Sequence, residues 1–244
     1  MEYIDAAIIE SSKLNRSISN LMKQGIHEIT VNNAHSMHNM CVGLTGDALI
    51  SITDSTGLYT ASFLEGPKVV IEGNAGWYAG DDMMDGELII KNNAGCNVGA
   101  YINGGTIVIY GSTGSRVGYG MKGGTILVCG NAGRWAAQMA MGGSLVVIGT
   151  VGNLIAESMY RGIVFTQDPD VSAKLGGNVF LDAITEEEKT YLTDLFAKYG
   201  VDADPVRFSA IRPALTGRHK YVLFKPELNK LDQKNYQPSK EVEV

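Results

Sequence analysis

The sequence is poor in the features that mark secreted, membrane-spanning and nucleic-acid-binding proteins. It has three cysteines without CxxC spacing, which favours reduced thiols and argues against an iron–sulfur cluster held by this chain alone. It has no apolar run near the about 18 residues that a membrane span requires, and its acidic start lacks the basic region of a signal peptide. The formal net charge of −6 disfavours nucleic acid and anionic membranes as partners. We therefore expect a cytoplasmic protein.

Residue patterns typical of catalysis or metal binding are also scarce. The acidic cluster of Asp81, Asp82 and Asp85 has no matching residues at the neighbouring turns, which favours a solvated turn over a catalytic site. His35 and His38 have loop spacing and no third ligand nearby, which disfavours a metal site. No Ser-His-Asp arrangement is recognisable. We therefore predict no catalytic, cofactor-binding or metal-binding residue in this chain.

Glycine is abundant, with 30 residues, and many of the glycines recur at a fixed spacing. The glycines before short apolar triplets stand 20, 19, 19, 19 and 19 residues apart and are Gly66, Gly86, Gly105, Gly124, Gly143 and Gly162. Each triplet, such as Ile107-Val108-Ile109, is followed by a second corner, such as Gly111-Ser-Thr-Gly114. β-Branched triplets between glycine and asparagine corners are too short for helices, and a period near 20 residues indicates stacked repeats.

We therefore predict an all-β solenoid, a right-handed parallel β-helix of about seven to eight rungs with a short helix at each end. The left-handed hexapeptide β-helix is the nearest competitor, but the sequence lacks its six-residue beat and its rungs of about 18 residues. The second corner adds a column that we expect to form a polar ladder, in which a side chain can bond to its copy on the next rung. The column consists of Asn74, Asn93, Ser112, Asn131 and Thr150.

Alternation along each strand decides which members of a triplet face the core. The first and third members share a face and are expected inside. A further inward column is expected three residues before each corner glycine, at Phe63, Met83, Ile102, Met121, Ala140 and Met159. The middle members form an outward apolar stripe of Val70, Ile89, Val108, Leu127 and Val146. Such a stripe is normally covered, and we expect a partner subunit or a second copy to cover it, with the chain's own C-terminal helix as the alternative.

The chain divides into a capping segment at 1–24, the β-helix at 25–183, and a C-terminal helix and arm at 184–244. Apolar residues at helical spacing predict a helix from Ser11 to Gln24 that closes the first rung. A capping box at Thr185–Glu188 begins a second helix, which runs to Tyr199. The basic segment 207–221 then predicts an extended arm, which either reaches a partner or lies on the chain's own acidic surface.

The repeated Gly-Gly-[Thr/Ser] strands, the Asn-Ala-Gly corners and the Gly-x-Gly after Arg116-Val117 resemble the GXGXG domain that ends the large subunit of glutamate synthase. The resemblance covers residues 25–183, and the segment 63–80 is particularly similar. In size and in its C-terminal helix and arm, the chain is most similar to the stand-alone GXGXG subunits of archaeal-type glutamate synthase and N-methylglutamate synthase. A related family is the C subunit of formylmethanofuran dehydrogenase, whose rungs share the Gly-Met-Lys-Gly-Gly sequence found at 120–124.

The resemblance implies a non-catalytic scaffold subunit of an oxidoreductase in glutamate biosynthesis and nitrogen metabolism. Its implied partners are a class II glutamine amidotransferase subunit, which releases ammonia, and an FMN-containing glutamate synthase subunit with an iron–sulfur cluster. These cofactors are expected in the partner subunits, because no catalytic residue of the family can be carried over to this chain. The alternatives are a scaffold in a formylmethanofuran-dehydrogenase-type complex and an autonomous β-helix enzyme or ligand-binding protein. The amine acceptor, the electron donor, the stoichiometry and any homo-oligomer stay open.

Overall fold

The computed structural model describes residues 1–214, of which Met1–Pro213 form one compact unit. Its strands are β1 (Glu2–Asp5), β2 (Glu28–Asn32), β3 (Leu49–Ile52), β4 (Lys68–Ile71), β5 (Glu87–Ile90), β6 (Thr106–Ile109), β7 (Thr125–Val128), β8 (Met141–Val147), β9 (Arg161–Thr166), β10 (Val179–Ala183) and β11 (Ser209–Pro213). Its helices are α1 (Ser11–Lys23) and α2 (Glu186–Tyr199), with the 3-10 turns η1 (Ala6–Ile8), η2 (Val171–Lys174) and η3 (Pro205–Arg207). Within the described residues, neither α-helix is long and apolar enough to cross a membrane.

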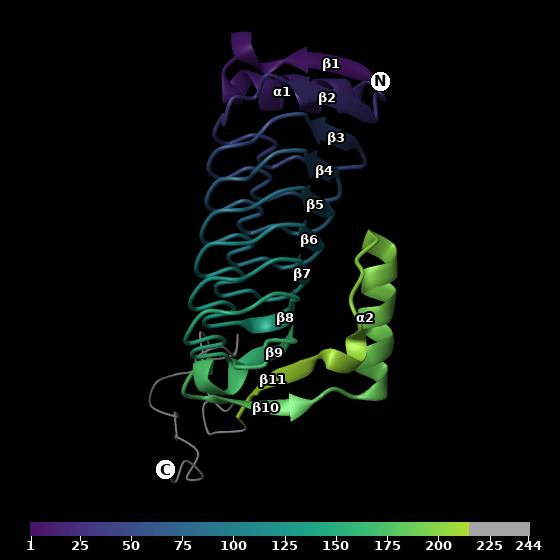
Figure 1. The fold of residues 1–244 in the computed structure, drawn as a ribbon. Helices are drawn as coiled ribbons and strands as arrows, with labels where there is room; N and C mark the ends of the chain where they lie inside the picture. The colour runs from purple at the N-terminus through teal and green to yellow at the C-terminus, as the bar shows by residue number, and fades with distance from the viewer. Residues whose placement is uncertain (215–244) are drawn as a thin grey trace, which may run out of the picture. The chain divides into compact units, whose positions relative to one another are not determined.

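All of these strands belong to one sheet in the order β1 through β9, then β11 and β10. Every neighbouring pair from β1 to β9 is parallel, whereas β11 runs antiparallel to both β9 and β10. Wide loops join consecutive strands from β2 to β9, so that each rung contributes one strand (Figure 1). The predicted β-solenoid is therefore confirmed.

The strand alternation separates two apolar clusters. Ile107 and Ile109 belong to the cluster inside the solenoid, whereas Val108 between them belongs to a second cluster on the outer side of the strands. The same division holds for each triplet from β4 to β8, because the parallel register places equivalent residues beside each other, as Ile107 beside Ile126. The predicted inward and outward positions of the triplets are confirmed.

One member of the predicted inward column is wrong. Phe63 is 52% exposed, and Leu64 is fully buried in its place. The interval from Gly66 to Gly86 is 20 residues rather than 19, so counting back three positions from Gly66 misses the core residue by one. The backbone hydrogen bonds also make Leu64 the equivalent of Met83. Each of these two residues has a carbonyl oxygen that accepts two N–H groups from the next rung.

The turns between rungs explain the Gly-x-Gly motif. Three alternate residues of each turn adopt left-handed backbone angles, as in Arg116 (φ 60°), Gly118 (φ 67°) and Gly120 (φ 61°). A residue other than glycine costs about 1 kcal/mol or more in this region. Space adds a second requirement at Gly99 (φ 63°), where a Cβ atom would lie 2.5 Å from Cδ1 of Ile126. The left-handed angle recurs at each rung, whereas the close contact occurs at Gly80 and Gly99, and Ala61, Ala137 and Ala156 occupy the equivalent position on other rungs.

Short elements close both ends of the core. Leu14 and Ile18 of α1 are fully buried in the interior cluster, and the helix stops before Gly25 (φ 81°), as predicted. At the other end the predicted arm is wrong for residues 209–213, which form β11 between β9 and β10. Arg212 holds this strand in place through ion pairs with Asp182 (2.8 Å) and Glu188 (2.9 Å). Arg207 ends η3 and Phe208 is buried, so the arm is also wrong there. Residues 215–221 of the predicted arm lie outside the described residues.

Candidate functional site

The apolar stripe predicted as an interface lies beneath α2. Four of its residues are at most 4% exposed and the fifth is partly buried: Ile89, Val108, Leu127 and Val146, and then Val70. The helix covers them with Leu192, Leu195, Phe196 and Tyr199. At about 1.5 Å per residue, α2 spans about four rung spacings of 4.8 Å, and Figure 1 shows it alongside the strands. The expectation that a partner subunit or a second copy covers the stripe is therefore wrong, and the alternative of the chain's own helix is correct.

Polar contacts near its C-terminal end hold α2 against the strands. The Tyr199 hydroxyl donates to Oε1 of Glu87 at 2.9 Å, and Nζ of Lys198 lies 2.6 Å from the same oxygen. The Tyr110 hydroxyl donates to the carbonyl oxygen of Tyr199 at 2.7 Å. Burial by itself raises the pKa of Glu87, but hydrogen bonds from Lys198, Lys68 and Tyr199 outweigh burial and lower this pKa to about 2. Glu87 therefore stays ionised and serves the docking of the helix.

The predicted polar ladder exists, but at most steps the backbone N–H of the next rung, and not the copy of the side chain, donates to the side-chain oxygen. Oδ1 of Asn93 accepts the N–H of Ser112 at 2.9 Å, and Oδ1 of Asn131 accepts the N–H of Thr150 at 2.8 Å. The same kind of bond links each rung from Ser55 onward to the next. Each side chain therefore satisfies a backbone group at the corner of the following rung. This column has a structural task, as the sequence predicted.

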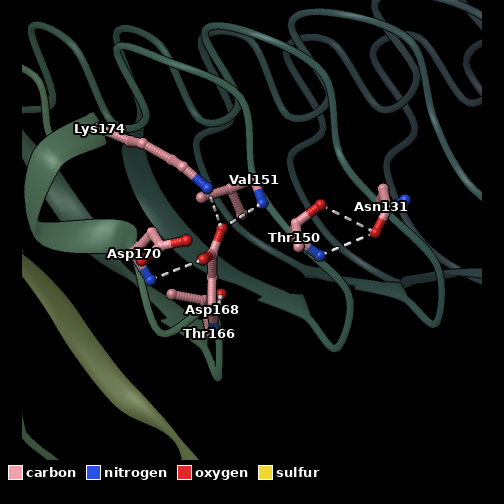
Figure 2. A network of polar contacts seen from close by, with 7 residues as sticks. All are labelled: Asn131, Thr150, Val151, Thr166, Asp168, Asp170 and Lys174. Carbon is pink, nitrogen blue, oxygen red and sulfur yellow. Dashed lines mark hydrogen bonds and ion pairs between the residues drawn. The ribbon is translucent and has the colours of Figure 1, made fainter.

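Beside the last residue of the ladder, Thr150, lies an ion pair that the sequence analysis did not find, with Asp168 fully buried and Lys174 21% exposed. Oδ2 of Asp168 accepts the N–H of Val151 at 2.8 Å and lies 2.7 Å from Nζ of Lys174, while Oδ1 accepts the N–H of Asp170 at 2.9 Å (Figure 2). Burial by itself raises the pKa of Asp168, but the bonds from Lys174 and the two backbone groups lower it below the ordinary value. Asp168 departs from the asparagine and glycine corners of earlier rungs, and that departure was the available signal.

The acidic corner is more buried than a solvated turn. One oxygen of Asp81 is buried without a hydrogen-bond partner among the described residues, and burial together with the charge of Asp82 raises the pKa of Asp81 to about 6. Asp82 pairs at 3.5 Å with Lys122, which lies two rungs further along the chain. The prediction of a solvated turn holds for Asp85, which is exposed. It is wrong for Asp81, and it overlooked Lys122 as a matching residue on another rung.

The histidines and cysteines have structural surroundings. Nδ1 of His38 accepts the N–H of Leu58 at 2.9 Å, which commits one ring nitrogen to the backbone. Within residues 1–214, no group of three His, Cys, Asp or Glu side chains is placed to hold a metal ion. Burial raises the pKa of Cys41 to about 12 and that of Cys129 to about 11. Both thiols are therefore protonated at neutral pH and are poor nucleophiles.

Two arginines and a tryptophan form a cluster on the turns that the sequence analysis also missed. The guanidinium carbons of Arg116 and Arg134 lie 4.5 Å and 4.4 Å from the ring centroid of Trp135. Nε of Arg116 donates to Oε1 of Gln138 at 3.1 Å. Neither arginine forms an ion pair with a carboxylate of the described residues. We call Arg116, Arg134 and Trp135 the arginine–tryptophan patch.

The sequence did contain a signal for this patch. Arg116 and Trp135 are 19 residues apart, which is one period of the repeat, and Arg134 directly precedes Trp135. Aligning the turns as well as the strands would have placed the three side chains together.

In comparisons with known proteins, no family model matches the sequence and no curated protein matches it significantly. Inferences about function therefore depend on the residues, the fold and the family resemblance of the repeat.

Proposed function

We propose that this chain is a non-catalytic assembly subunit of a glutamate-synthase-type oxidoreductase. It holds a separate class II glutamine amidotransferase subunit and a separate FMN and iron–sulfur synthase subunit on one rigid solenoid. The proposal joins the GXGXG-like repeat of the sequence to a fold in which that repeat builds stacked rungs. FMN and the iron–sulfur cluster belong to the partner subunits in this proposal.

One observation carries the non-catalytic role: the polar column that recurs on every rung is used by the fold itself. A catalytic β-helix presents an acid and a base on one parallel face, because lyase and hydrolase chemistry needs both groups at the reacting bond. Here the recurring polar column offers its oxygens to backbone N–H groups, as Asn93 does for Ser112. The outward apolar column packs under α2. The repeat therefore favours a rigid support over a reaction centre.

The proposal is tested by isolating the tagged chain from its source and by purifying it alone. From its source, the chain should co-purify with an amidotransferase and a flavoprotein, identified by mass spectrometry. Alone, it should show no flavin absorbance, no glutaminase activity and no glutamate formation. Turnover or a stoichiometric flavin in the isolated chain would refute the proposal. Co-purification with a molybdopterin enzyme would instead favour the formylmethanofuran-dehydrogenase-type scaffold.

A second candidate, an autonomous enzyme, is favoured by a single observation at Asp81. A carboxyl group with a pKa of about 6 and a buried oxygen without a partner among the described residues has the properties of a general acid or base. The Asp81→Asn substitution separates the two candidates, because it removes the titrating group and keeps the shape. An assembly subunit that carries this substitution should support complex formation and glutamate synthesis as well as the wild type does. An enzyme acting through Asp81 should instead lose about a hundredfold or more of its turnover.

A further inference from the structure

We propose that the arginine–tryptophan patch is the centre of a docking surface for a carboxylate-bearing segment of a partner protein. The inference rests on the proposed assembly function and adds to it the surface and the chemistry of the contact. The proposed docking surface lies on the turn side of the solenoid, which is distinct from the strand side that α2 covers.

The patch holds two cations ready for an anionic partner. Both guanidinium groups lie over the Trp135 ring within 4.5 Å of its centroid. Arg116 is further oriented by its bond to Gln138, so less conformational entropy is lost when the group binds a carboxylate. Lys122 differs from the two arginines, because it already pairs with Asp82. On a chain of net charge −6, the patch is thus a local positive site with open hydrogen-bond donors.

Large apolar side chains lie on turns along the same side of the solenoid, from three rungs before Arg116 to one rung after Trp135. They are 37 to 55% exposed and comprise Leu154, Tyr59, Met139 and Trp77. Tyr59, Arg116, Trp135 and Leu154 occupy equivalent positions of their turns, with φ between 59° and 61°. The turns from Tyr59 to Leu154 span about five rung spacings, or about 24 Å. That length suits an interface of standard size, about 800 Å² on each side.

The composition of the surface indicates a protein as its occupant. Tryptophan, tyrosine and arginine are the residues most enriched among those that dominate binding energy in protein interfaces. A second copy that used the same surface about a twofold axis would bring the arginines of both copies together, and like charges in contact are unfavourable. Nucleic acid is disfavoured by the net charge of the chain. A partner segment with Asp or Glu beside apolar residues complements both parts of the surface.

The test uses the full-length tagged chain in its source, with a photo-crosslinking amino acid in place of Leu154 at the edge of the surface. Illumination should link the chain to another polypeptide, and mass spectrometry should place the linked site in a segment that carries carboxylates. The same crosslinker in place of Ser12, which is exposed on α1, serves as the positional control. A link to a second copy, a link to nucleic acid, or no link from the Leu154 position would overturn the inference.

Charge variants decide whether the arginines carry the contact. Arg134→Ala removes an exposed side chain whose described contact is the Trp135 ring, and Arg116→Ala with Arg134→Ala removes both cations. The double variant should reduce crosslinking yield and affinity for the identified partner about tenfold or more, and the loss should shrink at high salt. Lys13→Ala with Arg16→Ala, on exposed positions of α1, matches the change in charge and should have no effect.

The outcomes separate this inference from the assembly function. If the linked polypeptide is neither an amidotransferase nor a flavoprotein, the assembly proposal fails while the docking surface stands. If the expected subunits co-purify but the link persists unchanged in both Arg134→Ala and the double variant, the docking inference fails alone. Thermal melting of each variant shows whether the solenoid is intact, and the exposed Arg134→Ala variant keeps the test valid if the double variant unfolds.

Discussion

Asp168 closes the polar ladder, and replacing it should cost the solenoid a measurable part of its stability. Asp168→Ala leaves the N–H of Val151 without an acceptor, and Val151 is only 4% exposed. A buried donor without a partner costs about 1–3 kcal/mol. The N–H of Asp170 also loses its acceptor but lies nearer to water, and the Lys174 side chain is 21% exposed and can turn to solvent. The expected loss is therefore about 2–4 kcal/mol.

Urea unfolding followed by circular dichroism measures this loss as a shift of the midpoint at constant slope. Asp168→Asn keeps the shape and one acceptor oxygen, so it should lose less, about 1–2 kcal/mol. Asp202→Ala is the control, because Asp202 is exposed on the loop after α2, and it should stay within about 0.5 kcal/mol of the wild type. If Asp168→Ala and Asp202→Ala shift the midpoint equally, the closing role of Asp168 is wrong.

The pH dependence provides an independent check on the same group. The pKa of Asp168 lies below the ordinary value of 3.8 in the folded chain. The stability from the charged form is therefore complete above about pH 5, and it is lost as the pH falls below 3.8 toward the folded pKa. The difference in stability between the wild type and Asp168→Asn should be constant near neutrality and shrink below about pH 4. A difference that grows in acid would contradict the assignment.

Two further predictions concern the helix cover and the turns. Val108→Lys together with Leu127→Lys should lower the free energy of unfolding by several kcal/mol and expose α2 to limited proteolysis, because both side chains are fully buried under that helix. Asp194→Lys, on the exposed side of α2, is the control. Equal proteolysis of the two variants would show that α2 is not held on the stripe. Gly99→Ala should cost about 2–4 kcal/mol in urea unfolding because of its positive φ and the contact with Ile126. Gly177→Ala, where a Cβ atom meets nothing within 4 Å, should cost at most about 0.5 kcal/mol, and an equal loss at both glycines would refute the steric argument.

Features with a short sequence range were predictable from the residues alone. The period of 19 residues, the alternation within Ile107-Val108-Ile109 and the capping box of Thr185 with Glu188 each depend on neighbours in the chain or on the next copy of the repeat. Hydrophobic alternation then separates inside from outside, because successive side chains of a strand point to opposite faces. The fold class follows from these local rules.

Small irregularities were enough to defeat the same reasoning at single positions. One additional residue between Gly66 and Gly86 moved the core position from Phe63 to Leu64, since a shift of one residue reverses the face of a strand or turn. The basic composition of residues 207–213 indicated an arm. Arg212 instead forms ion pairs with Asp182 and Glu188, and residues 209–213 join the sheet as β11.

The sequence by itself determined the repeat, the strands, the two helices and the apolar character of the outward stripe. Only the tertiary structure decided that α2 covers this stripe, that Asp168 closes the ladder and that Arg116 and Arg134 meet on Trp135. The physical reason is that an apolar face indicates a need for burial without naming its partner. A helix of this chain and a surface of another chain can both bury such a face, so the sequence does not distinguish them. Only the position of the helix in space does.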